Sequence, residues 1–303
     1  MKRDFQQLPS QATPMPYWVA SLADLPSDLK QAAMHSVGST DKPISICVFP
    51  GRTGLKSQSS WENIGEQALL FMEDGIFQIQ APASAHQEAR IIYLRAAELL
   101  YARLSLILMY GRLDLVDESL ARVVVEFNAA GFDIIRTGLQ NLLSTSCGRN
   151  TVSIPDALLT KTLLDEIGEL SYKFKNGLYL YGLLPGEQVE GFVFQPSLWG
   201  QRWHLFRLKM AETTLLALTD KQLIVVEEQS RSRFPAYGWI FTFYPRKAIK
   251  KIGVRPGRRW QELIIEMNSR TGLIDHRILL EQSNVSAWQE LWSRDRQPTP
   301  AAS

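Results

Sequence analysis

The sequence has few of the residues from which disulfides and metal sites are built. It contains 2 cysteines in 303 residues, Cys47 and Cys147, far apart and outside any C-x-x-C arrangement. We therefore expect no disulfide framework and no cysteine zinc site, and a reducing, cytoplasmic compartment fits best. The 4 histidines show no H-x-H or H-E-x-x-H pattern, although His276 could lie near Glu266 or Glu281. No metal site is predicted.

Long hydrophobic runs are also lacking. The longest, Leu104–Tyr110 (LSLILMY), lies between Arg103 and Arg112 and is far shorter than the roughly 20 apolar residues that cross a bilayer. The first residues, MKRDFQQLPS, have no apolar core, so we expect no secretory signal. Any contact with a membrane would then be peripheral, at its inner face, or through a partner.

Catalytic motifs are missing as well. Pro50–Ser57 (PGRTGLKS) has the spacing G-x-x-G-x-K-S, whereas a phosphate loop needs G-x-x-x-x-G-K-[ST] opening into a helix. Asp74 and Asp220 fall at expected hairpin turns, where aspartate is favoured for bonding to the backbone. We expect neither an enzyme nor a cofactor.

What the chain does contain is strand patterning. It is 45% hydrophobic and 21% charged, and its length suits two domains. Glu212–Glu228 (ETTLLALTDKQLIVVEE) predicts a β-hairpin, and Glu66–Gln80 (EQALLFMEDGIFQIQ) is a weaker copy. We expect a mainly β, α+β fold in five parts: an extension with a short helix capped by Ser27 (1–40), a first domain (41–145), a linker helix (146–185), a second domain (186–293) and a disordered tail (294–303).

Finer expectations concern single elements. Gly51–Ser60 and Gln195–Gln201 are expected to be loops, and Gly111 is expected to divide Leu99–Val116 into two strands. Ile154–Lys175 is expected to form one helix. Amphipathic helices should close the two domains, with Ile135 and Leu139 plugging the first core and Trp288 and Trp292 the second.

The two halves match in order along the chain, which indicates an internal repeat. Chance alignment of apolar strands is the alternative. The matched groups are Val48-Phe49 with Val193-Phe194, Leu69-Leu70-x-x-x-Asp74 with Leu215-Leu216-x-x-x-Asp220, Tyr93-x-Arg95-x-Ala97 with Tyr244-x-Arg246-x-Ala248, and Glu126-x-Asn128 with Glu266-x-Asn268.

The runs ETTLLALTDKQLIVVEE, FPAYGWIFTFYPRKAIKKIGV, WQELIIEMNSRTG and NVSAWQELW resemble bacterial pleckstrin-homology-like (PH-like) and GRAM-like domains over residues 188–293. The first half resembles them as a diverged copy. The resemblance implies two PH-like barrels, each a curved antiparallel sheet capped by a C-terminal helix, and a role in binding lipid or protein or in oligomerisation. It brings no catalytic residues. The basic pattern of phosphoinositide-binding members is absent, because QPSLWGQ has only Arg202 nearby.

One cationic run stands out in the second half. Residues 181–303 hold 17 Lys and Arg against 12 Asp and Glu, a net +5, and seven cations fall within 14 residues without an acid. The run and the tryptophan after it are Arg246, Lys247, Lys250, Lys251, Arg255, Arg258, Arg259 and Trp260.

Three interpretations of this run stay open: a solvated strand face, a surface for anionic lipid or an acidic protein, and, less favoured, a nucleic-acid contact. Trp199, expected in a loop, is the best candidate for an exposed interface residue. We expect a non-catalytic binding or scaffolding module acting through the basic face. A self-associating structural protein without lipid binding is the main alternative, and an enzyme with a site between the two domains is the remaining one.

Overall fold

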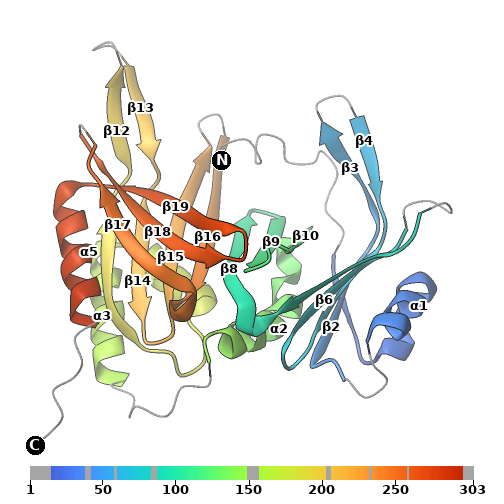
Figure 1. Ribbon diagram of the computed structural model, residues 1–303. Helices are drawn as coiled ribbons and strands as arrows, with labels where there is room; N and C mark the ends of the chain where they lie inside the picture. The colour runs from blue at the N-terminus through green and yellow to red at the C-terminus, as the bar shows by residue number, and fades with distance from the viewer. Residues whose placement is uncertain are drawn as a thin grey trace, which may run out of the picture. The chain divides into compact units, whose positions relative to one another are not determined.

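The chain folds into two compact units, residues 1–149 and 150–303. The computed structural model describes residues 15–37, 42–57, 60–82, 87–148, 157–202, 206–231, 234–257 and 259–295. These form antiparallel sheets with five α-helices, which confirms the mainly β, α+β class (Figure 1). Within the described residues no sheet closes into a barrel.

The first unit has a five-stranded sheet in the order β1-β2-β5-β6-β7. Its strands are β1 (Tyr17–Val19), β2 (Ser45–Phe49), β5 (Gln67–Phe71), β6 (Gly75–Gln80) and β7 (Arg90–Arg95). The hairpin of β3 (Arg52–Ser57) and β4 (Ser60–Ile64) continues β2 and β5 outward. The short helix η2 (Ala96–Glu98) leads into an antiparallel sheet of β8 (Leu99–Ile107), β9 (Tyr110–Asp117) and β10 (Arg122–Asn128).

Helices cover both faces of the five-stranded sheet. On one face Leu29 and Ala33 of α1 (Ser27–Ser36) are fully buried in a cluster with Ile46 and Leu70. On the other, α2 (Phe132–Ser146) approaches so closely that a Cβ at Gly138 would lie 2.3 Å from the ring of Phe71. Because β2 is buried on both faces, its sequence SICVF shows no alternation of polar and apolar residues.

The second unit begins with α3 (Ala157–Leu170), α4 (Tyr172–Gly177) and a π-helical turn, η4 (Leu178–Gly182). Its first sheet pairs β11 (Val189–Gln195), β14 (Thr214–Thr219), β15 (Gln222–Arg231) and β16 (Phe234–Pro245) in that order. The hairpin of β12 (Leu198–Arg202) and β13 (Phe206–Ala211) continues β11 and β14. After η5 (Arg246–Ala248) come β17 (Ile249–Arg255), β18 (Gln261–Ser269) and β19 (Gly272–Leu280), a three-stranded sheet, and then α5 (Gln282–Asp295).

Aromatic side chains fill the space between these layers. Phe174 of α4 is 1% exposed and meets the rings of Phe194 and Trp239 edge to face, with centroids 5.3 and 5.0 Å apart. Trp288 of α5 is fully buried, and its ring stacks with that of the half-buried Trp292 at 6.1 Å. Burial of Trp288, Ile135 and Leu139 agrees with the plug predicted for each terminal helix.

The two units follow one order of elements, including the split first hairpin, the 3₁₀ turn before the second sheet and the terminal helix. Each unit also has helices ahead of its first long strand. Helix α1 packs on β6 of the first unit, and α3 packs on α4 and β11 of the second. The residue-by-residue matches expected from the sequence agree less well with the structure. Glu126 lies in the third strand of its sheet and Glu266 in the second, so that match is wrong.

The hairpin turns β5–β6 and β14–β15 show that a second expected match is displaced by one residue. The pairs Phe71–Ile76 and Leu218–Leu223 flank four-residue turns, which makes Glu73 the counterpart of Asp220. The expected match of Asp74 with Asp220 is therefore wrong by one residue.

Several single-element predictions are corrected. The expected loops at Gly51–Ser60 and Gln195–Gln201 contain strands β3 and β12. The β8–β9 turn lies at Leu108-Met109, where Leu108 has φ 53°, because Gly111 is inside β9 beneath Phe127. The helix expected over Ile154–Lys175 breaks at Ser171, whose backbone is extended.

The ends of two helices also differ slightly from the predicted ones. Pro26, not Ser27, is the N-cap of α1. At the other end, α5 reaches Asp295, and the rest of the expected tail, 296–303, lies outside the described residues.

Candidate functional site

The fold separates the predicted cationic run into two groups. Arg246 and Lys247 lie in η5, before β17, whereas Arg255 and Arg259 lie at its far end. Strand β17 has 7 residues, so the groups are about 20 Å apart at roughly 3.3 Å per residue. Arg258 lies outside the described residues. The described cations of the run therefore do not form one patch.

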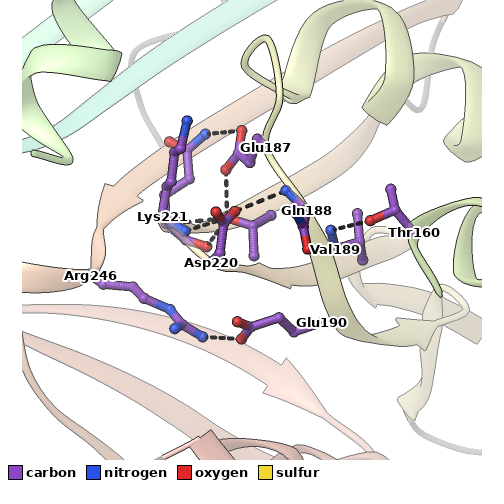
Figure 2. A network of polar contacts seen from close by, with 10 residues as sticks. Thr160, Glu187, Gln188, Val189, Glu190, Asp220, Lys221 and Arg246 are labelled. Carbon is purple, nitrogen blue, oxygen red and sulfur yellow. Dashed lines mark hydrogen bonds and ion pairs between the residues drawn. The ribbon is translucent and has the colours of Figure 1, made fainter. Parts of the chain in front are cut away.

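Acidic residues from neighbouring strands accompany several of these cations. Lys251 lies directly opposite Glu266, and the guanidinium of Arg255 lies 3.5 Å from the carboxylate of Glu262. At the η5 end, Arg246 pairs with Glu190 of β11 at 2.5 Å (Figure 2). Lys247 and Lys250 are exposed, and Lys250 occupies the bulge in the β17–β18 ladder. This face is therefore mixed in charge, and exposed ion pairs of this kind contribute little to stability.

The far end of β17 lies against the projecting hairpin of β12 and β13 (Figure 1). A Cβ at Gly200 of β12 would meet the side chain of Met210 at 3.0 Å and the ring of Trp260 at 3.3 Å. Arg259 places its guanidinium 4.9 Å from the centre of the Trp260 ring, within cation–π range. The β17–β18 turn therefore lies against the face of the hairpin that carries Met210.

Large apolar side chains are exposed on both faces of this hairpin. Trp199 is 48% exposed, Leu208 44% and Met210 39%. Lys209 lies opposite Trp199, with its ammonium 6.0 Å from the ring, and pairs with Glu212. We call this region the hairpin end, and its residues lie on both faces of the hairpin. Its members are Trp199, Leu208, Lys209, Met210, Arg255, Arg259 and Trp260.

Sequence reasoning found only part of the hairpin end. Trp199 was expected in a loop but lies in β12, and Leu208, Lys209 and Met210 were not singled out. A usable signal was present, because residues 191–211 contain no Asp or Glu. They do contain Arg202 and Arg207, which the backbone places near the tip of the hairpin.

A second polar centre lies where the linker enters the first sheet of the second unit. Glu187 is 6% exposed, and its carboxylate accepts hydrogen bonds from the Leu184 N–H at 2.6 Å, the Thr219 hydroxyl at 2.5 Å and the Gln222 amide at 3.0 Å (Figure 2). Burial raises the pKa of Glu187 to about 7, against the lowering effect of these bonds.

Asp220 lies beside this centre and has a structural role. Its carboxylate accepts a hydrogen bond from the Gln188 N–H at 2.8 Å, and its own N–H donates to the Gln188 carbonyl at 3.0 Å. Asp220 also raises the pKa of Glu187 slightly through its charge. Together the two acids hold the β14–β15 turn against the start of β11.

A cavity of about 400 Å³ lies between α4–η4 and the β15–β16 hairpin. Leu180, Tyr181 and Trp239 form its apolar wall. Lys173 and Glu228, 3.7 Å apart, line it as well. Among the residues that the structure describes, its lining has no histidine, cysteine or serine.

The remaining candidates also lack a reactive arrangement. The Nδ1 of His276 lies 2.8 Å from the hydroxyl of Tyr244 rather than beside Glu266 or Glu281. Pro50–Ser57 leads into strand β3, so it does not supply the helix N-terminus that a phosphate loop requires. Among the described residues there is no group of three or more potential metal ligands.

The helices and the comparisons add two findings. Within the described ranges, every helix is too short or too polar to cross a bilayer. A comparison with family models finds no match, and a comparison with curated proteins finds none either.

Proposed function

We propose that the protein is a non-catalytic binding module of two PH-like domains, which contacts an anionic membrane surface through the hairpin end of the second. The observation that carries the proposal is that aromatic and cationic side chains gather at one end of the second unit: the exposed Trp199 with Lys209 on one face of the hairpin, and Trp260 with Arg259 beside Met210 on the other. Tryptophan favours the interface between lipid and water, and cations favour anionic headgroups. The site would lie at the inner face of the membrane.

The PH-like part of the proposal is supported by the repeated order of elements. Each unit has a four-strand meander with a split first hairpin, a three-stranded sheet and a closing helix. The resemblance of residues 188–293 implies a curved antiparallel sheet closed by a C-terminal helix, and this order of elements is compatible with it in both units.

The hairpin end is favoured over the η5 end of the cationic run for two reasons. It combines cations with the exposed apolar side chains of Trp199, Leu208 and Met210. Its hairpin also projects beyond the four-stranded sheet of its own unit (Figure 1). An acidic protein partner would use the same cations but would have less need of Leu208 and Met210.

Co-sedimentation with vesicles of phosphatidylcholine, with and without phosphatidylserine, tests the proposal. We expect binding only to the anionic vesicles, weaker at physiological than at low ionic strength because salt screens the attraction. The pair Arg255→Gln/Arg259→Gln should weaken binding about thirtyfold, since each cation near an anionic leaflet contributes about 1 kcal/mol. Trp199→Ala should also weaken binding, because it removes an aromatic ring that favours the interface.

Matched controls come from the same chain. Trp18→Ala removes another exposed tryptophan, 59% exposed in β1, and Lys247→Gln/Lys250→Gln removes two cations at the η5 end of β17. Both variants should bind as the unaltered protein does. Equal losses from the two charge pairs would refute the placement of the site, and absence of binding to either vesicle would refute the membrane contact.

A further inference from the structure

Strand β19 is the last strand of its sheet and offers a long regular edge. It spans Gly272–Leu280, pairs with β18 without a bulge and contains no proline. In the described part of the chain the sheet order ends at β19, while α5 turns away to pack on β11 and β18. Natural proteins usually interrupt or cover an edge of this length, because it can pair with another strand.

The sequence of β19 is a chemical palindrome about His276. Residues 273–279 read LIDHRIL, so leucine mirrors leucine, isoleucine mirrors isoleucine and Asp275 mirrors Arg277. In an antiparallel pair of identical strands centred on His276, each residue faces its mirror image. Two copies would then place Leu273 opposite Leu279, Ile274 opposite Ile278, and Asp275 opposite Arg277.

We propose that two copies of this chain associate through antiparallel pairing of β19 with β19, on a two-fold axis through His276. The pairing would join two three-stranded sheets into one of six strands. A two-fold interface needs a self-complementary surface, and this strand has one. The proposal is independent of the membrane contact, because the hairpin end and β19 share no residue.

The two faces of the strand agree with this pairing. The ring of His276 is directed inward, with its Nδ1 2.8 Å from the Tyr244 hydroxyl, so its neighbours Asp275 and Arg277 are on the outer face. Within one chain these two already form an ion pair at 2.7 Å. Across the axis each would gain an opposite charge directly facing it. Leu273, 58% exposed, would be covered by Leu279 of the second copy.

Other registers are disfavoured by the same residues. A slip by two residues in one direction puts Asp275 opposite Asp275, and in the other direction it puts Arg277 opposite Arg277. Like charges directly opposite each other destabilise a strand pair. A slip by one residue would bring the inner face of one sheet to the outer face of the other. Parallel pairing in register also opposes like charges.

Sedimentation velocity of the full-length protein over a range of concentrations tests the pairing. We expect a reversible monomer–dimer equilibrium. Asp275→Arg and Arg277→Asp should each raise the dissociation constant at least about tenfold, because each creates two like-charge contacts per dimer. The double variant Asp275→Arg/Arg277→Asp should restore the dimer, since it only exchanges the charges. Lys251→Glu, on β17 at the opposite edge of the sheet, is the matched control and should leave the dimer unchanged.

Cross-linking tests the register. In Leu273→Cys/Leu279→Cys the two thiols of one chain are about 20 Å apart along the strand, too far for an internal disulfide. Oxidation should therefore link two chains, whereas Leu273→Cys alone should not, because it faces a leucine. A protein that stays monomeric at every concentration, a dimer indifferent to all three charge variants, or equal cross-linking by the single variant would each overturn the proposal.

Discussion

At the scale of single residues, Glu187 is a carboxyl that no cation neutralises in its network. Its three hydrogen bonds come from a backbone N–H, a hydroxyl and an amide. Burial favours the neutral acid more than these bonds favour the carboxylate, and the pKa of Glu187 rises to about 7. The β14–β15 turn is thus held by a group that changes charge near neutral pH.

A dependence of stability on pH follows from this pKa. The folded-state pKa is raised above the ordinary value of 4.5, so the contribution of Glu187 is fully present below about pH 4.5 and is lost as the pH rises through 7. The loss is on the order of a few kcal/mol, because the pKa rises from 4.5 to about 7 and each pH unit between these values corresponds to about 1.36 kcal/mol. Urea unfolding at pH 5 and pH 8 should show it.

Glu187→Gln is the comparison that isolates this effect. The amide mimics the neutral acid, so the variant should lack the part of the pH dependence that Glu187 supplies. Its free energy of unfolding at pH 8 should equal or exceed that of the unaltered protein. The same pH dependence in both proteins would contradict the assignment.

The close contact between α2 and the sheet at Gly138 leads to a prediction about stability. A Cβ at this position would lie 2.3 Å from the ring of Phe71, in a region buried on both sides of the sheet. Gly138→Ala should therefore destabilise the protein by about 1–3 kcal/mol, the usual cost of overpacking. Gly253→Ala is the control, because nothing lies within 4 Å of a Cβ there. Thermal unfolding of the two variants would decide, and equal midpoints would argue against a tight α2 contact.

At the scale of elements, α5 closes the second unit with a single large side chain. Trp288 is fully buried, and Val285 one turn earlier is 1% exposed. Trp288→Ala should cost about 3–5 kcal/mol, while Trp292→Ala, from the half-buried neighbour, should cost clearly less. Chemical denaturation measures both. A larger loss of stability from Trp292→Ala than from Trp288→Ala would contradict the assignment of Trp288 as the main core side chain of α5.

The elements also show where sequence patterns were sufficient. The hairpins around Glu66–Gln80 and Glu212–Glu228 and the two closing helices were predicted because their own sequences carry the pattern. Strands β3 and β12 were missed, because each lies in an arm where it pairs with a single strand and its sequence, RTGLKS or LWGQR, lacks a regular alternation of polar and apolar residues. The β8–β9 turn was misplaced because Gly111 serves packing against Phe127, which a glycine in sequence does not distinguish from a turn.

The candidate site was harder to predict for a related reason. The cations follow one another in the sequence, but strand β17 is extended and so separates the two ends of the run. Glu262 and Glu266 of β18 lie opposite Arg255 and Lys251 because of the strand register, which the sequence alone does not show. Likewise, Gly200 and Trp260 are 60 residues apart, and only the fold shows that the β17–β18 turn lies against the hairpin.

At the scale of the whole molecule, each unit has its own buried core. Leu29, Ile46 and Leu70 belong to the first, and Trp288, Leu263 and Phe241 are fully buried in the second. Differential scanning calorimetry should resolve two transitions, because domains with separate cores unfold as separate units. Gly138→Ala should lower one midpoint and Trp288→Ala the other. A single transition that both variants lower equally would contradict this.

The split first hairpin, present in both units, has a consequence for how such chains can change in length. The arm beyond the sheet pairs only with itself, as β3 with β4 and β12 with β13. Residues can therefore be added to or removed from it without altering the core, provided that each strand gains or loses an even number and every side chain keeps its face. In proteins that descend from such a chain, the length of this arm should therefore change by two residues per strand. A change by an odd number of residues should be accompanied by a β-bulge.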